Sequence, residues 1–439
     1  MTALLRPGYR WQRGAPRRRQ HGLATLVVVM LLLLVMALVA GYTNRNLFFE
    51  QRVSANQYRA TQALEAAEAG LEWGLAMLSA GRIDATCQPV ADPASAEPSF
   101  RQRYLQIDDV DGSIEALTTA AGAPLQPACV FDGAAWRCSC PTAGAPALAE
   151  PAGLDSHPAF RLEFEGAPGL PAGVVRLQAV GCTRLDAAQV CADEASSGDG
   201  RAVVTVLVAL QSALRTPPVG AVTVPGVPAA PDFGVGLLRA VNADAVAGGV
   251  TLHTGVAPVG VAELHTVPGS PAAESAVEDA TLVPLGADDL LFNHLFGMEV
   301  ATYGDQPGTI VVDCDAGCGA AGVRDMVRLN PGRMVWIDGD LDLDIADPIG
   351  TPDAPALLVV DGTLTASDPA AAVTGMIYTF GDTSGVPGAL TLRGALVAHT
   401  TLTLAGPGTT TVVYDRDVLQ RLRLTHGSFV QVPGSWRDF

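Results

Sequence analysis

The stretch RRRQHG at residues 17–22 is followed at once by LATLVVVMLLLLVMALVA at residues 23–40. Six arginines precede Gly22, and the next charged side chain is Arg45. An uncharged run of this length spans a hydrocarbon core of ~30 Å as a helix, because each residue adds ~1.5 Å. The sequence therefore predicts one membrane-spanning helix, Leu23–Tyr42. The arginines favour a cytoplasmic N-terminus at the inner membrane, with the bulk of the chain in the periplasm.

The order of glycine and apolar run is also informative. An ordinary signal peptide has a shorter apolar region with a small-residue cleavage site after it. Here Gly22 stands before the apolar run. This order resembles a type IV prepilin leader, residues 1–22. The resemblance implies that prepilin peptidase cleaves between Gly22 and Leu23 and that the new N-terminus is methylated.

A second motif, ALEAAEAGLEWG, occupies residues 63–74. Together with the Gly22–Leu23 junction, it makes residues 22–78 similar to the N-terminal domain of PilX-type pilus assembly proteins. That resemblance implies a minor pilin-like subunit whose partners are other minor pilins, the major pilin and the inner-membrane assembly platform. The chain departs from pilins at two positions. Leu23 replaces the usual Phe, and Val27 replaces the Glu that major pilins carry five residues into the mature chain.

The expected fold class is α+β. One pilin-type helix is predicted over residues 23–80, with Gly81 as its C-cap, and it is expected to loosen at residues 41–46. In its second half an apolar stripe should pack against a globular head, whereas three glutamates mark solvated faces. The stripe consists of Leu64, Ala67, Leu71, Leu75 and Leu78, and the glutamates are Glu65, Glu68 and Glu72.

Beyond the helix, three regions are predicted. Residues 81–215 form a disulfide-stapled α+β head, whose small antiparallel sheet contains strands at 160–164, 174–180 and 201–210. Residues 216–231 are rich in proline and are predicted to be a stiff linker. Residues 232–439 form a β-rich, solenoid-like domain with a helix at 287–298, because short strands centred on Gly339, Gly362 and Gly394 recur. A β-sandwich with glycine at its turns is the alternative.

All eight cysteines follow the membrane segment: Cys87, Cys129, Cys138, Cys140, Cys182, Cys191, Cys314 and Cys318. An even number in an exported region predicts disulfides. The pairs Cys182–Cys191 and Cys314–Cys318 would each close a short loop. Cys138 and Cys140 are expected to pair with Cys87 and Cys129 rather than with each other. A zinc site at Cys129, Cys138 and Cys140 is the alternative.

The sequence contains no motif that indicates catalysis. It has no lysine, which excludes a P-loop and a Schiff base, and no HExxH or GxSxG pattern. The formal charge of −18 argues against nucleic-acid binding.

The aspartates Asp338, Asp340, Asp342 and Asp344 alternate, so on a strand they would share one face. They are weak candidates for Ca²⁺ ligands, and a solvated acidic face is the alternative.

The sequence thus predicts a type IV pilus assembly protein without enzymatic activity or cofactor. Because Val27 leaves the subunit without the usual buried carboxylate, we expect it near the filament tip. One alternative is a tip pseudopilin of a type II secretion system. Another is a membrane-anchored adhesin or a polysaccharide-acting β-helix enzyme.

Overall fold

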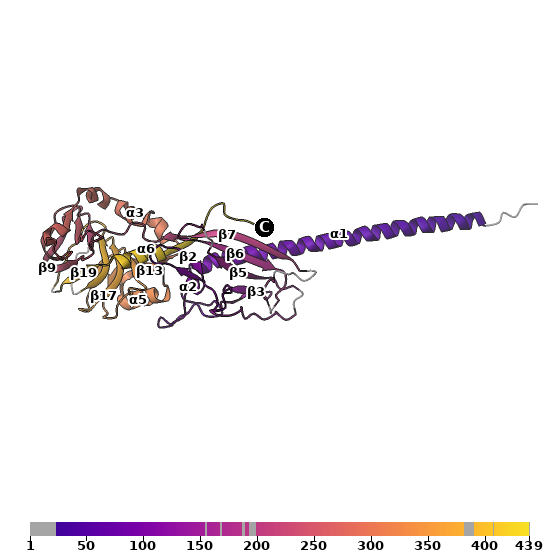
Figure 1. Cartoon of the computed structure of the whole chain (residues 1–439), viewed down its shortest axis with the longest axis horizontal. Coiled ribbons are helices and arrows are strands. Elements are labelled where there is room, and N and C mark those ends of the chain that lie inside the picture. Colours follow the sequence, from indigo (N-terminus) through magenta and orange to yellow (C-terminus); the bar gives the residue numbers. More distant parts are fainter. Residues whose placement is uncertain are drawn as a thin grey trace, which may run out of the picture. The chain divides into compact units, whose positions relative to one another are not determined.

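The structure is a computed structural model that describes residues 23–153, 156–166, 169–186, 189–192, 199–381, 390–406 and 408–438. The predicted leader, residues 1–22, lies outside the described residues. The chain divides into two compact units after Tyr58. Helix α1, Leu23–Leu78, starts in the first unit and ends in the second (Figure 1).

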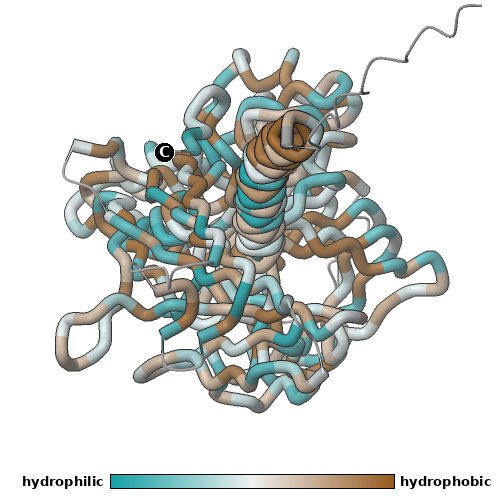
Figure 2. The backbone as a smooth tube through the Cα atoms, turned by 90° about the vertical axis from the view of Figure 1, so that its right-hand side faces the viewer, coloured by the Kyte–Doolittle hydropathy of each residue, from teal (hydrophilic) through white to brown (hydrophobic). Residues whose placement is uncertain are grey.

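The first unit consists of the apolar part of α1. Among the described residues, α1 is the one helix that is long and apolar enough to cross a membrane, and no part of its most apolar stretch is buried. Figure 2 shows that the free end of this helix is hydrophobic. The helix continues without interruption through residues 41–46, where loosening was expected. An apolar helix exposed on all sides requires a cover, such as lipid or other helices.

In the second unit, the end of α1 packs on an antiparallel sheet with the strand order β20-β7-β6-β5-β3-β4. Ala67, Leu71 and Leu78 share a core with Phe160 and Leu162 of the sheet, so the predicted stripe forms the contact. A short helix and a two-stranded sheet complete this head: α2 Phe100–Tyr104, β1 Leu105–Ile107 and β2 Ile114–Ala116. The six strands are β3 Ala128–Phe131, β4 Trp136–Ser139, β5 Ala159–Glu165, β6 Val174–Cys182, β7 Arg201–Ser212 and β20 Gly427–Gln431.

The C-terminal β region is a 12-stranded sheet in which the main path of strands is β11-β9-β19-β18-β17-β15-β14-β13. Every strand pairing in it is parallel. Sandwiches are built from antiparallel sheets, so the sandwich alternative is wrong. The strands are β8 Val222–Val224, β9 Asp232–Val241, β10 Leu252–Thr254, β11 Val259–His265, β12 Ala276–Glu278, β13 Thr309–Gly319, β14 Met334–Asp342, β15 Ala356–Val360, β16 Leu364–Thr365, β17 Ala372–Thr379, β18 Thr391–Ala398 and β19 Thr410–Tyr414.

Successive coils of this solenoid stack equivalent apolar residues on one another. Val335, Leu358, Ile377 and Leu396 form one buried column, which Val222 of β8 continues. This column extends the hydrophobic core from coil to coil, since each coil alone cannot bury its apolar face.

The glycines that suggested the repeat belong to two columns. A Cβ on Gly362 would lie 2.4 Å from the Gly339 backbone, so these two glycines stack directly. Gly394 instead stacks on Gly375, at φ angles of 136° and 147° that favour glycine. The step from Gly362 to Gly394 therefore does not correspond to one coil of the solenoid.

The β region is inserted between two neighbouring strands of the head. Ser212, at the end of β7, pairs with Gly427, at the start of β20, and residues 213–426 lie between them. Two details differ from the predicted boundaries. First, the proline-rich segment 216–231 is not a free linker: it contains β8, which is buried and in which Val222 stacks on Leu396. Second, the last strand, β20, pairs with β7 in the head sheet.

Short helices pack on both faces of this sheet: α3, α4 and α6 contribute to the core on one face, whereas Ala320 and Val323 of α5 join the core on the other face. α3 lies within the predicted helix 287–298 and ends at Gly297, whose φ of 74° is left-handed. Its aromatic residues share a core with Trp336 and Tyr378 of the sheet. The helices of this region are η1 Ala272–Ser275, η2 Ala280–Gly286, α3 Leu290–Phe296, α4 Val300–Gly304, α5 Ala320–Leu329 and α6 Arg416–Thr425.

Candidate functional site

Two of the positions that the prepilin resemblance singles out, Leu23 and Val27, lie at the start of α1. Gly22 is outside the described residues, and Leu23 is the first residue of the helix. The Val27 side chain is 48% exposed on a helix surface that consists of other apolar side chains. Cleavage between Gly22 and Leu23 therefore remains a prediction, and Val27 presents only methyl groups to any neighbouring subunit.

The small residues of the motif at 63–74 bring α1 close to the head sheet. A Cβ on Gly70 would lie 2.7 Å from the Phe160 ring, and a Cβ on Gly74 would lie 2.6 Å from Leu162. Gly181 of the sheet faces the helix in the same way, because its Cβ would lie 2.2 Å from the Ala63 carbonyl oxygen. The helix and sheet backbones thus approach at a distance that larger side chains would prevent.

The glutamates of the same motif point away from this contact. Glu65, Glu68 and Glu72 are all exposed, and none of them forms an ion pair with another described residue. The motif therefore has two parts: its small residues pack within the chain, and its carboxylates remain available to solvent or to a partner.

We predict that Gly181→Ala lowers the free energy of unfolding by about 3 kcal/mol, because overpacking against backbone atoms forces the helix away from the sheet. Thermal unfolding measured by circular dichroism tests this. Gly322→Ala is the control, since nothing lies within 4 Å of its Cβ position. Alanine there should stabilise α5 by up to about 1 kcal/mol. Equal melting temperatures for Gly181→Ala and the parent protein would contradict the close approach.

All eight cysteines form disulfides: Cys87–Cys140, Cys129–Cys138, Cys182–Cys191 and Cys314–Cys318. The pairs Cys182–Cys191 and Cys314–Cys318 are those expected from the sequence, and Cys138 and Cys140 pair with Cys129 and Cys87 rather than with each other. The zinc alternative is wrong, because the three sulfurs that it requires are all in disulfide bonds.

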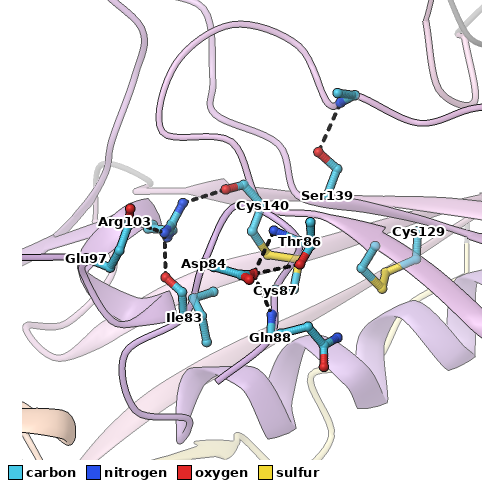
Figure 3. The surroundings of a disulfide bond; sticks show 12 residues. Ile83, Asp84, Thr86, Cys87, Gln88, Glu97, Arg103, Cys129, Ser139 and Cys140 are labelled. Carbon is cyan, nitrogen blue, oxygen red and sulfur yellow. Dashed lines mark hydrogen bonds and ion pairs between the residues drawn. A yellow bond between two sulfur atoms is a disulfide. The ribbon is translucent and has the colours of Figure 1, made fainter. Parts of the chain in front are cut away.

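The Cys87–Cys140 bridge connects the segment after α1 to the end of β4 (Figure 3). Beside it, the buried Arg103 donates hydrogen bonds to the carbonyl oxygens of Cys140 at 2.6 Å and Ile83 at 2.5 Å. Arg103 also pairs with Glu97 at 2.5 Å. The bridge and Arg103 together tie a segment without regular structure to the head.

A second buried arginine joins the head to the β region. Arg101 is 3% exposed and donates hydrogen bonds to the carbonyl oxygens of Leu78 at 2.9 Å, Gly332 at 3.1 Å and Gly427 at 3.1 Å. Its guanidinium also lies over the Phe429 ring, 5.1 Å from the centroid. Burial, and then the nearby Arg333, lower the pKa of Arg101 to about 9, so it is charged at neutral pH. One cation therefore links the end of α1, a solenoid loop and β20.

Two half-buried arginines, Arg82 and Arg421, reinforce this junction. The Arg82 side chain donates a hydrogen bond to the Arg328 carbonyl oxygen at 2.7 Å. The Arg82 backbone N–H donates a second one to the Leu329 carbonyl oxygen at 2.7 Å. Arg421 of α6 binds Asp109 of the head and, at 3.2 Å, Asp353 of the solenoid. The hydrogen bond and charge of Arg421 hold the pKa of Asp109 below its usual value, although burial opposes this. The sequence contains no signal for these partners, which are far apart along the chain.

Three of the four alternating aspartates accept hydrogen bonds from backbone N–H groups of neighbouring segments. Asp340 accepts from Thr363 at 2.6 Å, Asp342 from Ser367 at 3.0 Å and Asp344 from Ala320 at 2.8 Å. Within the described part of the chain, no group of three or more His, Cys, Asp or Glu side chains could hold a metal ion. These carboxylates connect coils of the solenoid, and Asp338 is exposed.

Comparison with known proteins bears mainly on the N-terminal segment. Residues 21–72 match the model of the PilX N-terminal family. No curated protein matches the sequence. Among solved structures, the crystal structure of competence-associated pilin ComZ from Thermus thermophilus aligns with 87% of this chain and 98% of that chain, at 12% identity and a TM-score of 0.17. At that score the similarity carries no argument.

Proposed function

We propose, from the PilX N-terminal segment at residues 21–72, that this chain is a minor pilin-like subunit that acts in type IV pilus assembly. The observation that supports this most directly is the division of α1. Its first part is apolar and exposed, whereas the motif at 63–74 packs it onto a head domain. Such a helix anchors the subunit in the inner membrane first and can then pack among other apolar helices in a filament.

Val27 supports a position near the filament tip. In pilins, the Glu at this position is expected to neutralise the N-terminal amine of a neighbouring subunit inside the apolar core. A buried charge without its partner costs several kcal/mol, and Val27 offers no carboxylate. A site at the tip, where no neighbouring amine needs that carboxylate, avoids this cost. The subunit would then act early in assembly together with other minor pilins and the inner-membrane platform.

Processing is the first test of this proposal. We expect the mature protein from cells to begin at Leu23, with a methylated N-terminus, and Gly22→Val to accumulate as the uncleaved precursor. Mass spectrometry of the N-terminal peptide measures both. An intact N-terminus in the parent protein, or one near Ala40, would contradict the prepilin leader.

Location is the second test. Immunogold labelling of sheared pili with antibodies to the β region should place gold at one end of each fibre. Gold spread along the shaft would contradict the tip position, although not a role in the pilus.

We also propose that the role involves no catalysis. Release of reducing ends from polysaccharides by the full-length protein would favour the enzyme alternative instead.

A further inference from the structure

A pocket of about 340 Å³ lies between the exposed side of α1 and the β3–β4 hairpin of the head. Phe131, Trp136 and Pro158 contribute aromatic and apolar walls. Glu65, Gln62 and Ser156 contribute polar groups. The pocket thus contains one of the motif glutamates that make no ion pair with another described residue.

The aromatic wall is held in place by local structure. Phe131 and Trp136 are directly opposite each other in the hairpin, and their ring centroids are 5.6 Å apart. The Trp136 ring also packs against Phe160 of the core at 4.9 Å, yet 37% of the residue is exposed. The Cys129–Cys138 bridge lies two residues from each ring. The wall is therefore preorganised, with an indole accessible to solvent.

The charge of the pocket is negative. Asp132, at the hairpin turn, is paired with Arg137 at 2.7 Å, so these two charges offset each other. The Ser156 hydroxyl donates a hydrogen bond to the Gln62 side-chain amide oxygen at 3.1 Å. The Glu65 carboxylate retains its full capacity to accept hydrogen bonds. An aromatic surface beside a free carboxylate is complementary to an organic cation.

We propose that this pocket binds an arginine side chain presented by a partner protein. A guanidinium is planar, so it can stack on the Trp136 ring while its N–H groups donate to Glu65. A lysine ammonium matches the charge but lacks the flat surface that stacks on an indole. The formal charge of −18 favours approach of a basic partner. This inference rests on the pocket alone and does not depend on the proposed pilus role.

The test uses full-length protein in detergent, labelled with 5-fluorotryptophan and observed by ¹⁹F NMR. Trp136→Phe identifies the Trp136 resonance. Titration with argininamide should shift this resonance with saturation, because charge and stacking act together. Citrullinamide, whose side chain has nearly the same shape but no charge, should bind at least about tenfold more weakly, a difference of about 1.4 kcal/mol.

Matched variants separate the pocket from general attraction to an acidic helix. Glu65→Gln should weaken argininamide binding by about tenfold, because glutamine keeps one acceptor oxygen but removes the negative charge that strengthens the hydrogen bonds from the guanidinium. Glu72→Gln removes another exposed charge of α1, outside the pocket, and should leave binding unchanged. Equal shifts with citrullinamide, equal weakening by both variants, or no shift of the Trp136 resonance with argininamide would each overturn the proposal.

Discussion

Replacing Arg101 by methionine is expected to destabilise the second unit by about 4 kcal/mol or more. Methionine fills much of the same volume but leaves two buried carbonyl oxygens, those of Leu78 and Gly427, without a donor. The Gly332 carbonyl oxygen loses one of its two donors and keeps the Gly427 N–H at 3.1 Å. Each unsatisfied buried group costs about 1–3 kcal/mol. For a unit of about 380 residues, a loss of 4 kcal/mol corresponds to a fall in melting temperature of about 5 °C.

Differential scanning calorimetry of the detergent-solubilised protein measures this effect. Arg423→Met is the matched control, because Arg423 is exposed on α6 and should change stability by less than about 0.5 kcal/mol. Equal melting temperatures for Arg101→Met and the parent protein would contradict the prediction. They would mean that the cost of burying the guanidinium equals what its three hydrogen bonds contribute.

Removing the Cys87–Cys140 bridge is expected to have a comparable effect. The bridge joins residues 53 positions apart, and closing a loop of that length contributes about 4 kcal/mol in the chain-entropy model. The double substitution Cys87→Ser, Cys140→Ser should therefore lower the free energy of unfolding by about that amount, as measured by chemical denaturation. The same substitutions also release the segment that Arg103 binds.

The Cys314–Cys318 bridge supplies the comparison, because its sequence separation is 4. Its double serine variant should lose only about 2 kcal/mol in the same model. Alkylation of the unfolded, unreduced parent protein should label no cysteine, and this excludes an incomplete set of bridges. Equal losses in the two double variants would show that loop entropy is not the source of the stabilisation.

Local patterns were sufficient to predict several elements of the fold. The apolar run after Gly22 predicted the exposed part of α1, and its 3–4 spacing predicted which residues meet the sheet. Alternating residues predicted β5 and β6, and a more fully apolar run predicted β7, all to within two residues at each end. Helix and strand periods act over a few residues, so they can be detected in the sequence without knowledge of the partner surface.

The candidate sites were harder to predict from the sequence than the helices and strands, because most of their contacts form only in the tertiary structure. The even number of cysteines and their spacing were enough to predict disulfides. In contrast, nothing near Arg101 indicates that its three acceptors come from α1, the solenoid and β20. The pocket at Trp136 likewise needs Glu65, which is more than 70 residues away in the sequence. The insertion of the β region between β7 and β20 also could not be predicted, because local patterns do not specify which strand a terminal segment will pair with.

The sequence by itself determined the membrane-compatible helix, the face of α1 that contacts the head, and the presence of short, glycine-centred strands beyond residue 232. Each follows from periodic burial or from the loss of charge over a continuous stretch. Only the tertiary structure decided the strand order, the two glycine columns, the buried β8 within the proline-rich segment and the junction at Arg101. These features depend on contacts between residues far apart in the chain, whose free energy arises only when both surfaces are in place.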